Sequence, residues 1–245
     1  MTNCIYSFSS DGDFIGKTLE LPDSTTENFL GVCYLTASPE SDGYYAVNVY
    51  TGGSTPQNPQ FSYLDKTGKL VSLIPGRELK DGVFMPDRMF TDFENGRVFA
   101  WDQLVDTLFL VNRDGVEPYY IFDFGENAFP AEYQQGNYYD REARFLEEHS
   151  GKPYASFLKY FQVVDGYMYF SFFTPRDPLV VYIVRYDERN SRSSIITLTD
   201  PNGKLALNVF FKVTPEYVIA SLGNNGDTEA NPSLYLLPLS TFDID

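Results

Sequence analysis

Residues 106–130 read DTLFLVNRDGVEPYYIFDFGENAFP, and this stretch decides the fold. Two runs rich in apolar and aromatic residues flank an Arg-Asp-Gly turn, and the second run ends at Phe124-Gly125, ahead of Pro130. An Asp-Gly pair favours a β-hairpin because both residues tolerate a positive φ. Aromatic side chains fall on both faces of this hairpin, so the sequence predicts a pair of strands that is covered on both sides.

Similar turns recur along the chain in two alternating kinds. The first kind precedes a dense aromatic or β-branched run, and the second kind lies inside a hairpin. Turns of the first kind lie at Gly43, Gly96, Gly166 and Glu216, and turns of the second kind lie at Gly12, Gly68, Gly115 and Asn190. Each full period has about 50 residues and room for four short strands, which matches one blade of a β-propeller.

The hydrophobic pattern distinguishes a propeller from a sandwich. A sheet with one wet face alternates apolar and polar residues, whereas YMYFSFF at 167–173 and LVVYIVRY at 179–186 are apolar at both odd and even positions. In a propeller every blade lies between two neighbours, so the inner strands lose the alternation. We therefore predict an all-β fold, a single β-propeller domain over residues 1–245 built from four-stranded antiparallel blades.

One interval between turns, from Gly115 to Gly166, is longer than the others. It contains residues 131–161, where the apolar residues have helical spacing. Phe145 with Leu146, and then Phe157 with Leu158, predict two short helices, which Gly151 and Pro153 separate. We expect a helical insertion between two blades, packed on one rim of the propeller.

The charge of the chain excludes some classes of partner. Acidic residues outnumber basic ones by 34 to 18, so the protein repels nucleic acid and anionic membrane surfaces. No apolar run is long enough for a transmembrane helix. The two cysteines, Cys4 and Cys33, lack the spacing of a metal or redox site, and we interpret them as ordinary thiols. No basic and apolar leader precedes Cys4, so we expect no signal peptide in this chain.

A family resemblance follows from residues 85–130, MPDRMFTDFENGRVFAWDQLVDTLFLVNRDGVEPYYIFDFGENAFP. Its Asp-Thr-Leu-Phe strand, Arg-Asp-Gly turn and Asp-Phe-Gly exit with a later proline resemble the six-bladed β-propeller family of Bacteroidota. The ending ANPSLYLLPL at 230–239 is similar to the terminal strand of that family. Members are typically exported lipoproteins without an assigned activity, so the resemblance implies a location in the periplasm or at the cell surface.

The chain is shorter than the resemblance implies. Its turns account for two strands, three whole blades and three last strands, or four to five blades, where the family has six. We therefore expect an N-terminally truncated copy of such a propeller. A smaller closed ring of four or five blades is the alternative.

Motifs for catalysis and metal binding are few. His149 is the sole histidine and is predicted to lie at a helix C-terminus, where a cation is favourable. No HExxH, GxSxG or GxGxxG motif is present. Asp11 and Asp13 fit a turn better than a calcium loop. The loop at 223–232 gathers Asn and acidic residues that could hold a hard cation, but a polar surface loop explains it as well. We expect no cofactor, with calcium as the alternative.

Candidate binding residues cluster at predicted strand ends and loops. Trp101, Asp102 and Arg88 are predicted to form a rim site, and Arg176 joins them from the loop after residue 173, because loops at one face of a propeller usually carry binding.

Two functions from different classes remain. The first is a non-catalytic binding or scaffold propeller of the cell envelope, whose ligand is a carbohydrate or a protein. The alternative is an enzyme similar to propeller lactonases or hydrolases, which would hold a divalent cation with acidic and Asn side chains in the central channel.

Overall fold

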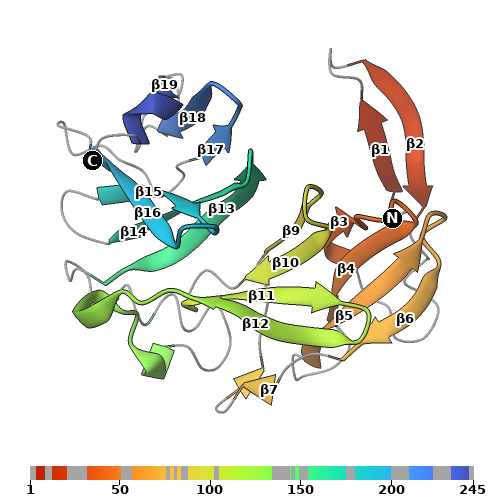
Figure 1. The fold of residues 1–245 in the computed structure, drawn as a ribbon. Coiled ribbons are helices and arrows are strands. Elements are labelled where there is room, and N and C mark those ends of the chain that lie inside the picture. The colour runs from red at the N-terminus through yellow and green to blue at the C-terminus, as the bar shows by residue number, and fades with distance from the viewer. Residues whose placement is uncertain are drawn as a thin grey trace. The chain divides into compact units, whose positions relative to one another are not determined.

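The chain forms an all-β structure, seen in a computed structural model (Figure 1). The structure describes residues 4–8, 13–20, 32–50, 57–75, 78–79, 82–83, 88–101, 105–133, 144, 147–148, 154–174, 180–199, 210–222 and 233–242. Most of these residues lie in antiparallel strands, so the predicted fold class is confirmed. Within the described part of the chain, no helix has the length and hydrophobicity that a membrane span requires.

The chain divides into two compact units, of which unit 1 comprises residues 1–102 and 107–120. Its described strands pair as a hairpin β1-β2, a sheet β3-β4-β5-β6, a small hairpin β7-β8 and a sheet β12-β11-β10-β9. These strands are β1 (Cys4–Phe8), β2 (Phe14–Glu20), β3 (Val32–Ala37), β4 (Gly43–Tyr50), β5 (Gln57–Asp65), β6 (Leu70–Ile74), β7 (Glu78–Leu79), β8 (Gly82–Val83), β9 (Arg88–Asp92), β10 (Arg97–Trp101), β11 (Thr107–Asn112) and β12 (Gly115–Ile121), which ends at the sequence boundary of the unit.

Unit 2 comprises residues 103–106 and 121–245. It holds a four-stranded sheet, β13-β14-β15-β16, and a three-stranded sheet, β17-β18-β19. These strands are β13 (Ser156–Val164), β14 (Tyr167–Thr174), β15 (Val180–Asp187), β16 (Arg192–Thr199), β17 (Phe210–Val213), β18 (Tyr217–Leu222) and β19 (Ser233–Pro238), and the short 3-10 turns are η1 (Gly125–Asn127), η2 (Ala131–Tyr133) and η3 (Leu239–Phe242).

The two kinds of turn have different places in these sheets. Turns of the first kind join the first and second strands of a sheet, as in β3-β4, β9-β10, β13-β14 and β17-β18. Turns of the second kind close the hairpins β5-β6, β11-β12 and β15-β16, whereas Gly12, between β1 and β2, lies outside the described residues. The predicted hairpin of residues 106–130 is confirmed as β11 and β12.

In both units, the first strand of one sheet contacts the first strand of the next sheet. In unit 1 the first strands of the two four-stranded sheets lie against each other, and the hydroxyls of Thr36 on β3 and Thr91 on β9 are 2.8 Å apart. In unit 2 the backbone N–H of Val213 on β17 donates to the side-chain oxygen of Gln162 on β13, at 3.2 Å. Contacts between the first strands of successive sheets are typical of neighbouring propeller blades.

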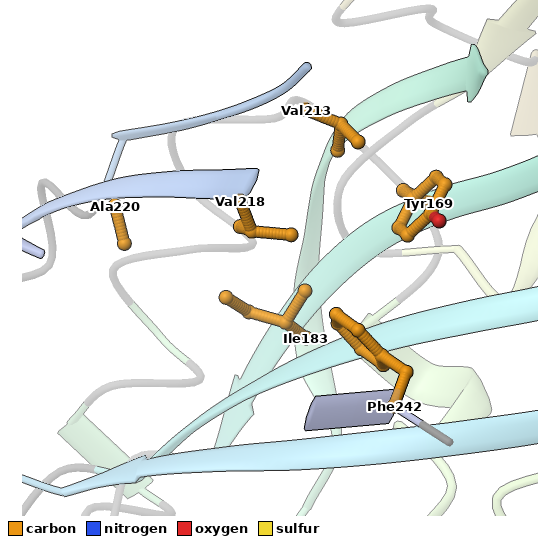
Figure 2. Packing of buried hydrophobic residues seen from close by; sticks show 6 residues of the cluster. All are labelled: Tyr169, Ile183, Val213, Val218, Ala220 and Phe242. Atoms are coloured by element: carbon orange, nitrogen blue, oxygen red, sulfur yellow. The ribbon is translucent and has the colours of Figure 1, made fainter. Parts of the chain in front are cut away.

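Strand β14 shows why apolar and polar residues do not alternate at positions 167–173. Every residue from Met168 to Thr174 is buried. On one face Phe170 stacks on Phe161 with ring centres 5.1 Å apart, and Phe122 lies 4.7 Å from Phe170. On the other face Tyr169 belongs to a second cluster, shown in Figure 2, with members from the four strands β14, β15, β17 and β18 and from η3. That cluster contains Tyr169, Ile183, Val213, Val218, Ala220 and Phe242.

The first helix of the predicted insertion is described at three positions only, and its Phe145 and Leu146 lie outside the described residues. Arg144, Glu147 and Glu148 are α-helical. The second predicted helix is wrong, because Ser156–Val164 forms strand β13. The register of β13 shifts twice, between Ser156 and Lys159 and between Lys159 and Gln162, and a residue of this segment, Tyr160, has a φ of 60°.

These irregularities explain the misleading pattern. A β-bulge adds a residue to one strand and therefore breaks the two-residue period of the side chains. As a result Leu158 and Phe161, three positions apart, are both buried. Three-residue spacing is also the spacing of a helix face, so the sequence favoured a helix here.

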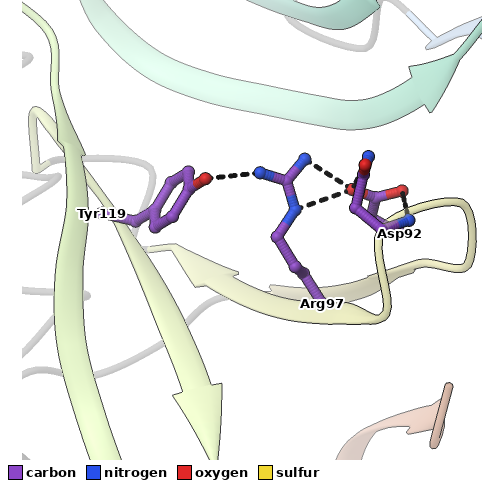
Figure 3. Close-up of polar contacts among 4 residues, drawn as sticks. Asp92, Arg97 and Tyr119 are labelled. Atoms are coloured by element: carbon purple, nitrogen blue, oxygen red, sulfur yellow. Dashed lines mark hydrogen bonds and ion pairs between the residues drawn. The ribbon is translucent and has the colours of Figure 1, made fainter. Parts of the chain in front are cut away.

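Asp and Asn side chains close several turns by accepting backbone N–H groups. The carboxylate of Asp65, for example, accepts from the N–H groups of Thr67 and Lys69, at 2.8 and 3.0 Å. The carboxylate of Asp92 likewise accepts from the backbone N–H of Asn95. It is fully buried, however, and it also forms an ion pair with Arg97 (Figure 3).

The contacts of Arg97 are closely organised. Its Nε and Nη2 donate to Asp92 Oδ2 at 2.9 and 2.6 Å, and its Nη1 donates to the Tyr119 hydroxyl at 2.5 Å. The guanidinium lies 5.2 Å from the ring centres of both Phe99 and Tyr119. Arg97 on β10 therefore links Asp92 at the end of β9 with Tyr119 on β12, and so connects three strands of this sheet.

Gly43 at the start of β4 has no room for a side chain. A Cβ atom there would lie 2.1 Å from the carbonyl oxygen of Leu64 and 2.7 Å from the Tyr63 hydroxyl. We expect Gly43→Ala to lower the free energy of unfolding by about 1–3 kcal/mol, because backbone atoms of the paired strand must move.

Gly115→Ala is the matched control in the same unit. The nearest atom to its added Cβ would be the Pro75 carbonyl oxygen at 3.9 Å, an ordinary contact. Urea unfolding of both variants tests the prediction, and an equal midpoint for Gly43→Ala and Gly115→Ala would contradict it.

Candidate functional site

Two of the four predicted binding residues lie in the described part of unit 1. Arg88 and Trp101 are directly opposite each other in the β9-β10 ladder. Trp101 is only 3% exposed and packs edge-on against Phe90, with ring centres 5.9 Å apart. The structure thus gives Trp101 a place in the core. Asp102 and Arg176 lie outside the described residues, and the ligand-binding role of all four stays a prediction.

The residues considered for metal binding are mostly outside the described part as well. His149, Asp11 and the loop at 223–232 fall there, whereas Asp13 is exposed. Among the residues that the structure describes, no three His, Cys, Asp or Glu side chains gather closely enough to hold a metal ion.

A concave site is present in unit 2, and we call it the Arg185 pocket. It has a volume of about 950 Å³ and lies beside β14, β15, β16 and η3. Its lining comprises the charged residues Arg185, Asp187 and Arg192, the amide and hydroxyl residues Asn190, Ser193, Ser194 and Thr241, and the apolar residues Tyr167, Ile195, Ile196 and Phe242. Pockets for small ligands commonly have volumes of about 300–1,000 Å³.

The strand register explains why these side chains meet. Asp187 on β15 is directly opposite Tyr167 on β14 and Arg192 on β16, and Arg185 is opposite Ser194. Directly opposite residues of an antiparallel ladder point to the same side of the sheet. The outer end of this face therefore collects polar groups next to the apolar cluster of Figure 2.

Arg185 is half-buried and held in a defined position. Its Nη2 donates to the backbone carbonyl of Phe242 at 3.0 Å. The guanidinium lies 4.9 Å from the ring centre of Tyr167 and 5.4 Å from that of Phe242. Aromatic rings attract a cation through their negative faces, so these contacts fix the guanidinium at the pocket wall.

Asp187 anchors the turn beside the pocket. Its carboxylate accepts from the backbone N–H of Arg189 at 3.0 Å, from Arg189 Nε at 3.3 Å and from Asn190 Nδ2 at 2.8 Å. Burial opposes ionisation of this carboxyl, but the hydrogen bonds from Asn190 and Arg189 hold its pKa below the ordinary value. Asp187 is therefore charged at neutral pH and is satisfied by its own turn.

Arg192 is placed differently. It is exposed and, although it lies opposite Asp187 in the ladder, it forms no ion pair within the described ranges. A guanidinium presents a planar set of N–H donors that matches a carboxylate or another oxygen ligand. The pocket thus offers one fixed guanidinium, one exposed guanidinium and several hydroxyl and amide groups to a ligand.

One feature of the sequence could have indicated this site, but it was interpreted only as part of a turn. Residues 189–194 read RNSRSS, a polar run between two strongly apolar strands. Asn190 was assigned to a hairpin turn, which is confirmed, but the Arg and Ser residues that follow were not singled out. Their meeting with Arg185 and η3 depends on the strand register and on a segment about 50 residues later in the chain.

A second polar cluster, in unit 1, joins two neighbouring sheets. Asp42 accepts hydrogen bonds from the Tyr63 hydroxyl, from Arg113 Nη2 at 2.5 Å and from the Ser38 hydroxyl at 2.9 Å. These bonds hold the pKa of Asp42 well below its ordinary value. The Arg113 guanidinium also lies over the Tyr63 ring, at 4.1 Å. Because its members bond to one another, this cluster fits a structural link better than a ligand site.

Comparisons with known proteins identify similar solved structures. No protein-family model and no curated protein sequence matches the chain. A Bacteroides fragilis protein assigned as exported is 13% identical, with a TM-score of 0.48 and coverage of 90% of this chain and 74% of that one. A Bacteroides uniformis protein assigned as a 6-phosphogluconolactonase is 11% identical, with a TM-score of 0.39 and coverage of 97% of this chain and 66% of that one. At these identities and TM-scores, neither structure assigns a family or an activity to the chain.

Proposed function

We propose that this protein is a non-catalytic, ligand-binding propeller protein of the cell envelope, and that it holds a carbohydrate in the Arg185 pocket. The observation that carries the proposal is the pocket itself. Its guanidinium groups and the hydroxyl of Ser194 belong to residues of the hydrogen-bonded strands β15 and β16. Sites built on strands hold their side chains more firmly than sites on loops. The resemblance of residues 85–130 to exported propellers supports the location.

The chemistry of the lining favours a carbohydrate over an apolar ligand. Sugar hydroxyls both donate and accept hydrogen bonds, and they are matched by groups that do the same. Asn190, Ser194 and Thr241 provide such groups around the pocket. Ile196, on the same side of the sheet as Arg185, adds an apolar surface for the carbon side of a sugar ring.

Filling the pocket tests this function. Ser194 lies opposite Arg185 on the same side of the sheet, so Ser194→Tyr places a ring in the space that a ligand would occupy. We expect wild-type protein to give signals on an array of bacterial and plant glycans and Ser194→Tyr to lose at least about 90% of each signal, as a tenfold weaker affinity would cause.

Thr197→Tyr is the matched control, since Thr197 is exposed on the same strand and does not line the pocket. It should keep the wild-type signals. Full binding by Ser194→Tyr, or no glycan signal from the wild type, would contradict the proposed function.

A further inference from the structure

The three-stranded sheet of unit 2 has an open edge at β19. The sheets β3-β4-β5-β6, β12-β11-β10-β9 and β13-β14-β15-β16 each have four strands, whereas β17-β18-β19 has three. Among the residues that the structure describes, β19 pairs only with β18, so the backbone groups along its other side have no ladder partner there. An open edge of this kind can add a strand from another chain.

Apolar side chains are exposed along this edge. Leu234, Tyr235 and Leu236 are consecutive residues of β19, and they are 70%, 45% and 61% exposed. Successive side chains of a strand point to opposite faces of the sheet, so both faces of the edge expose apolar surface. A strand added beside β19 would contact all three side chains, because opposite side chains of neighbouring strands lie about 4.5–5.5 Å apart.

The charges around β19 are all of one sign. The strand itself is uncharged, and residues 213–245 contain no lysine or arginine. The acidic residues of this segment are Glu216, Asp227, Glu229, Asp243 and Asp245. Glu216 is exposed and lies at the end of β19, where its backbone carbonyl accepts from the N–H of Leu239. An apolar edge within a purely acidic segment attracts a basic partner.

We propose that the β19 edge binds a partner peptide that is extended, apolar and flanked by lysine or arginine. The peptide adds a fourth strand to the sheet through backbone hydrogen bonds to β19. Its apolar side chains pack beside Leu234 and Leu236 on one face and beside Tyr235 on the other, and its basic flanks are attracted by the acidic residues of segment 213–245. This inference is independent of the carbohydrate proposal, since none of these three residues lines the Arg185 pocket.

A second copy of the chain fits this edge less well than a basic peptide does. Two paired β19 strands would bring together two copies of the same acidic segment, in chains that each have a net charge of −16. These like charges oppose association, whereas a basic partner is attracted by them. The charge of the segment therefore selects the partner.

Three labelled peptides test the proposal by fluorescence anisotropy with the whole chain. The first has a core of six residues, the length of β19, in which valine and threonine alternate between pairs of lysines. The second has glutamates in place of the lysines. The third has proline at the two central core positions, one of which must donate to β19 in any register. We expect the first peptide to bind, and the other two to bind at least about tenfold more weakly.

A variant of β19 locates the binding. Leu236→Lys removes an apolar contact and adds a charge that opposes strand addition, so the lysine-flanked peptide should bind it at least about tenfold more weakly. Leu73→Lys is the matched control, because Leu73 is 51% exposed on β6, the outermost strand of a four-stranded sheet, and the net charge changes equally. It should bind the peptide as the wild type does.

Hydrogen exchange of the wild type gives a second measurement that needs no variant. The lysine-flanked peptide should slow exchange of the β19 amides and leave exchange of the β6 amides unchanged. Complete protection of the β19 amides without peptide would mean that the edge is already covered within the protein, and would overturn the proposal.

The other outcomes are equally distinct. Absence of peptide binding to the wild type overturns the proposal, equal binding of the lysine and glutamate peptides overturns the charge of the partner, and equal binding by Leu236→Lys and Leu73→Lys overturns the location. A dimer that light scattering detects in the wild type but not in Leu236→Lys would make a second copy the occupant instead. None of these results affects the carbohydrate proposal, which Ser194→Tyr tests separately.

Discussion

Asp92→Ala is expected to lower the free energy of unfolding by about 3–5 kcal/mol, the cost of removing one partner from a buried ion pair. The Asp92 side chain is fully buried and that of Arg97 is 14% exposed. Without the carboxylate, the Arg97 guanidinium stays in a largely buried site and keeps only the Tyr119 hydroxyl among the partners of Figure 3. The turn also loses two hydrogen bonds from Asn95.

The single tryptophan makes this loss measurable. Trp101 is buried on β10, the strand that starts at Arg97, so its fluorescence during urea unfolding reports on unit 1. Asp65→Ala is the matched control, because Asp65 caps a turn of the same unit with no buried cation beside it. It should shift the unfolding midpoint far less.

A double variant isolates the reason for the loss. Replacing both partners of a buried pair with apolar groups is often nearly neutral, because no charge is then left unpaired. Asp92→Ala/Arg97→Met should therefore be more stable than Asp92→Ala, with Met occupying the space between Phe99 and Tyr119. A double variant less stable than Asp92→Ala would show that the charge of Arg97 was not the cause.

Ile183→Ala is expected to destabilise unit 2 by about 2–5 kcal/mol. Ile183 on β15 is completely buried in the cluster of Figure 2, between Val218 of the three-stranded sheet and the Phe242 ring of η3. Truncation removes three methyl or methylene groups from water-free contacts and leaves a cavity that the paired strands can close only in part.

Ile195→Ala provides the comparison on the neighbouring strand. Ile195 is 56% exposed, so the same truncation should change stability by no more than about 0.5 kcal/mol. Hydrogen exchange of the β14–β16 amides measures both effects where they occur, since Trp101 lies in unit 1. Equal exchange in Ile183→Ala and Ile195→Ala would exclude the cluster as the stabilising core of unit 2.

The hairpins were the part of the fold that sequence reasoning predicted best. Gly68, Gly96 and Gly166 all have positive φ and lie in the turns that the sequence placed there. A turn of this kind depends on residues next to each other in the chain, and glycine accepts its backbone conformation without steric cost. The four-strand period followed from the spacing of these turns.

Strand β13 was predicted less well because its pattern is not local. A bulge is fixed by the partner strand and by the side chains that the bulged strand must bury, not by the propensities of its own residues. Leu158 and Phe161 face the core three positions apart only because β14 imposes this register. A single sequence cannot distinguish that spacing from a helical one.

The sequence by itself determined the strand class, the alternating turns and the two-sided burial of β14, because each depends on local backbone preference and on a hydrophobic pattern within one segment. The tertiary structure alone decided that Trp101 lies in the core and that Arg185, Arg192 and Phe242 share a pocket. The physical reason is that pairing register and the packing of distant segments set which side chains meet. A shift of one residue in that register would turn every one of the β16 side chains to the opposite face.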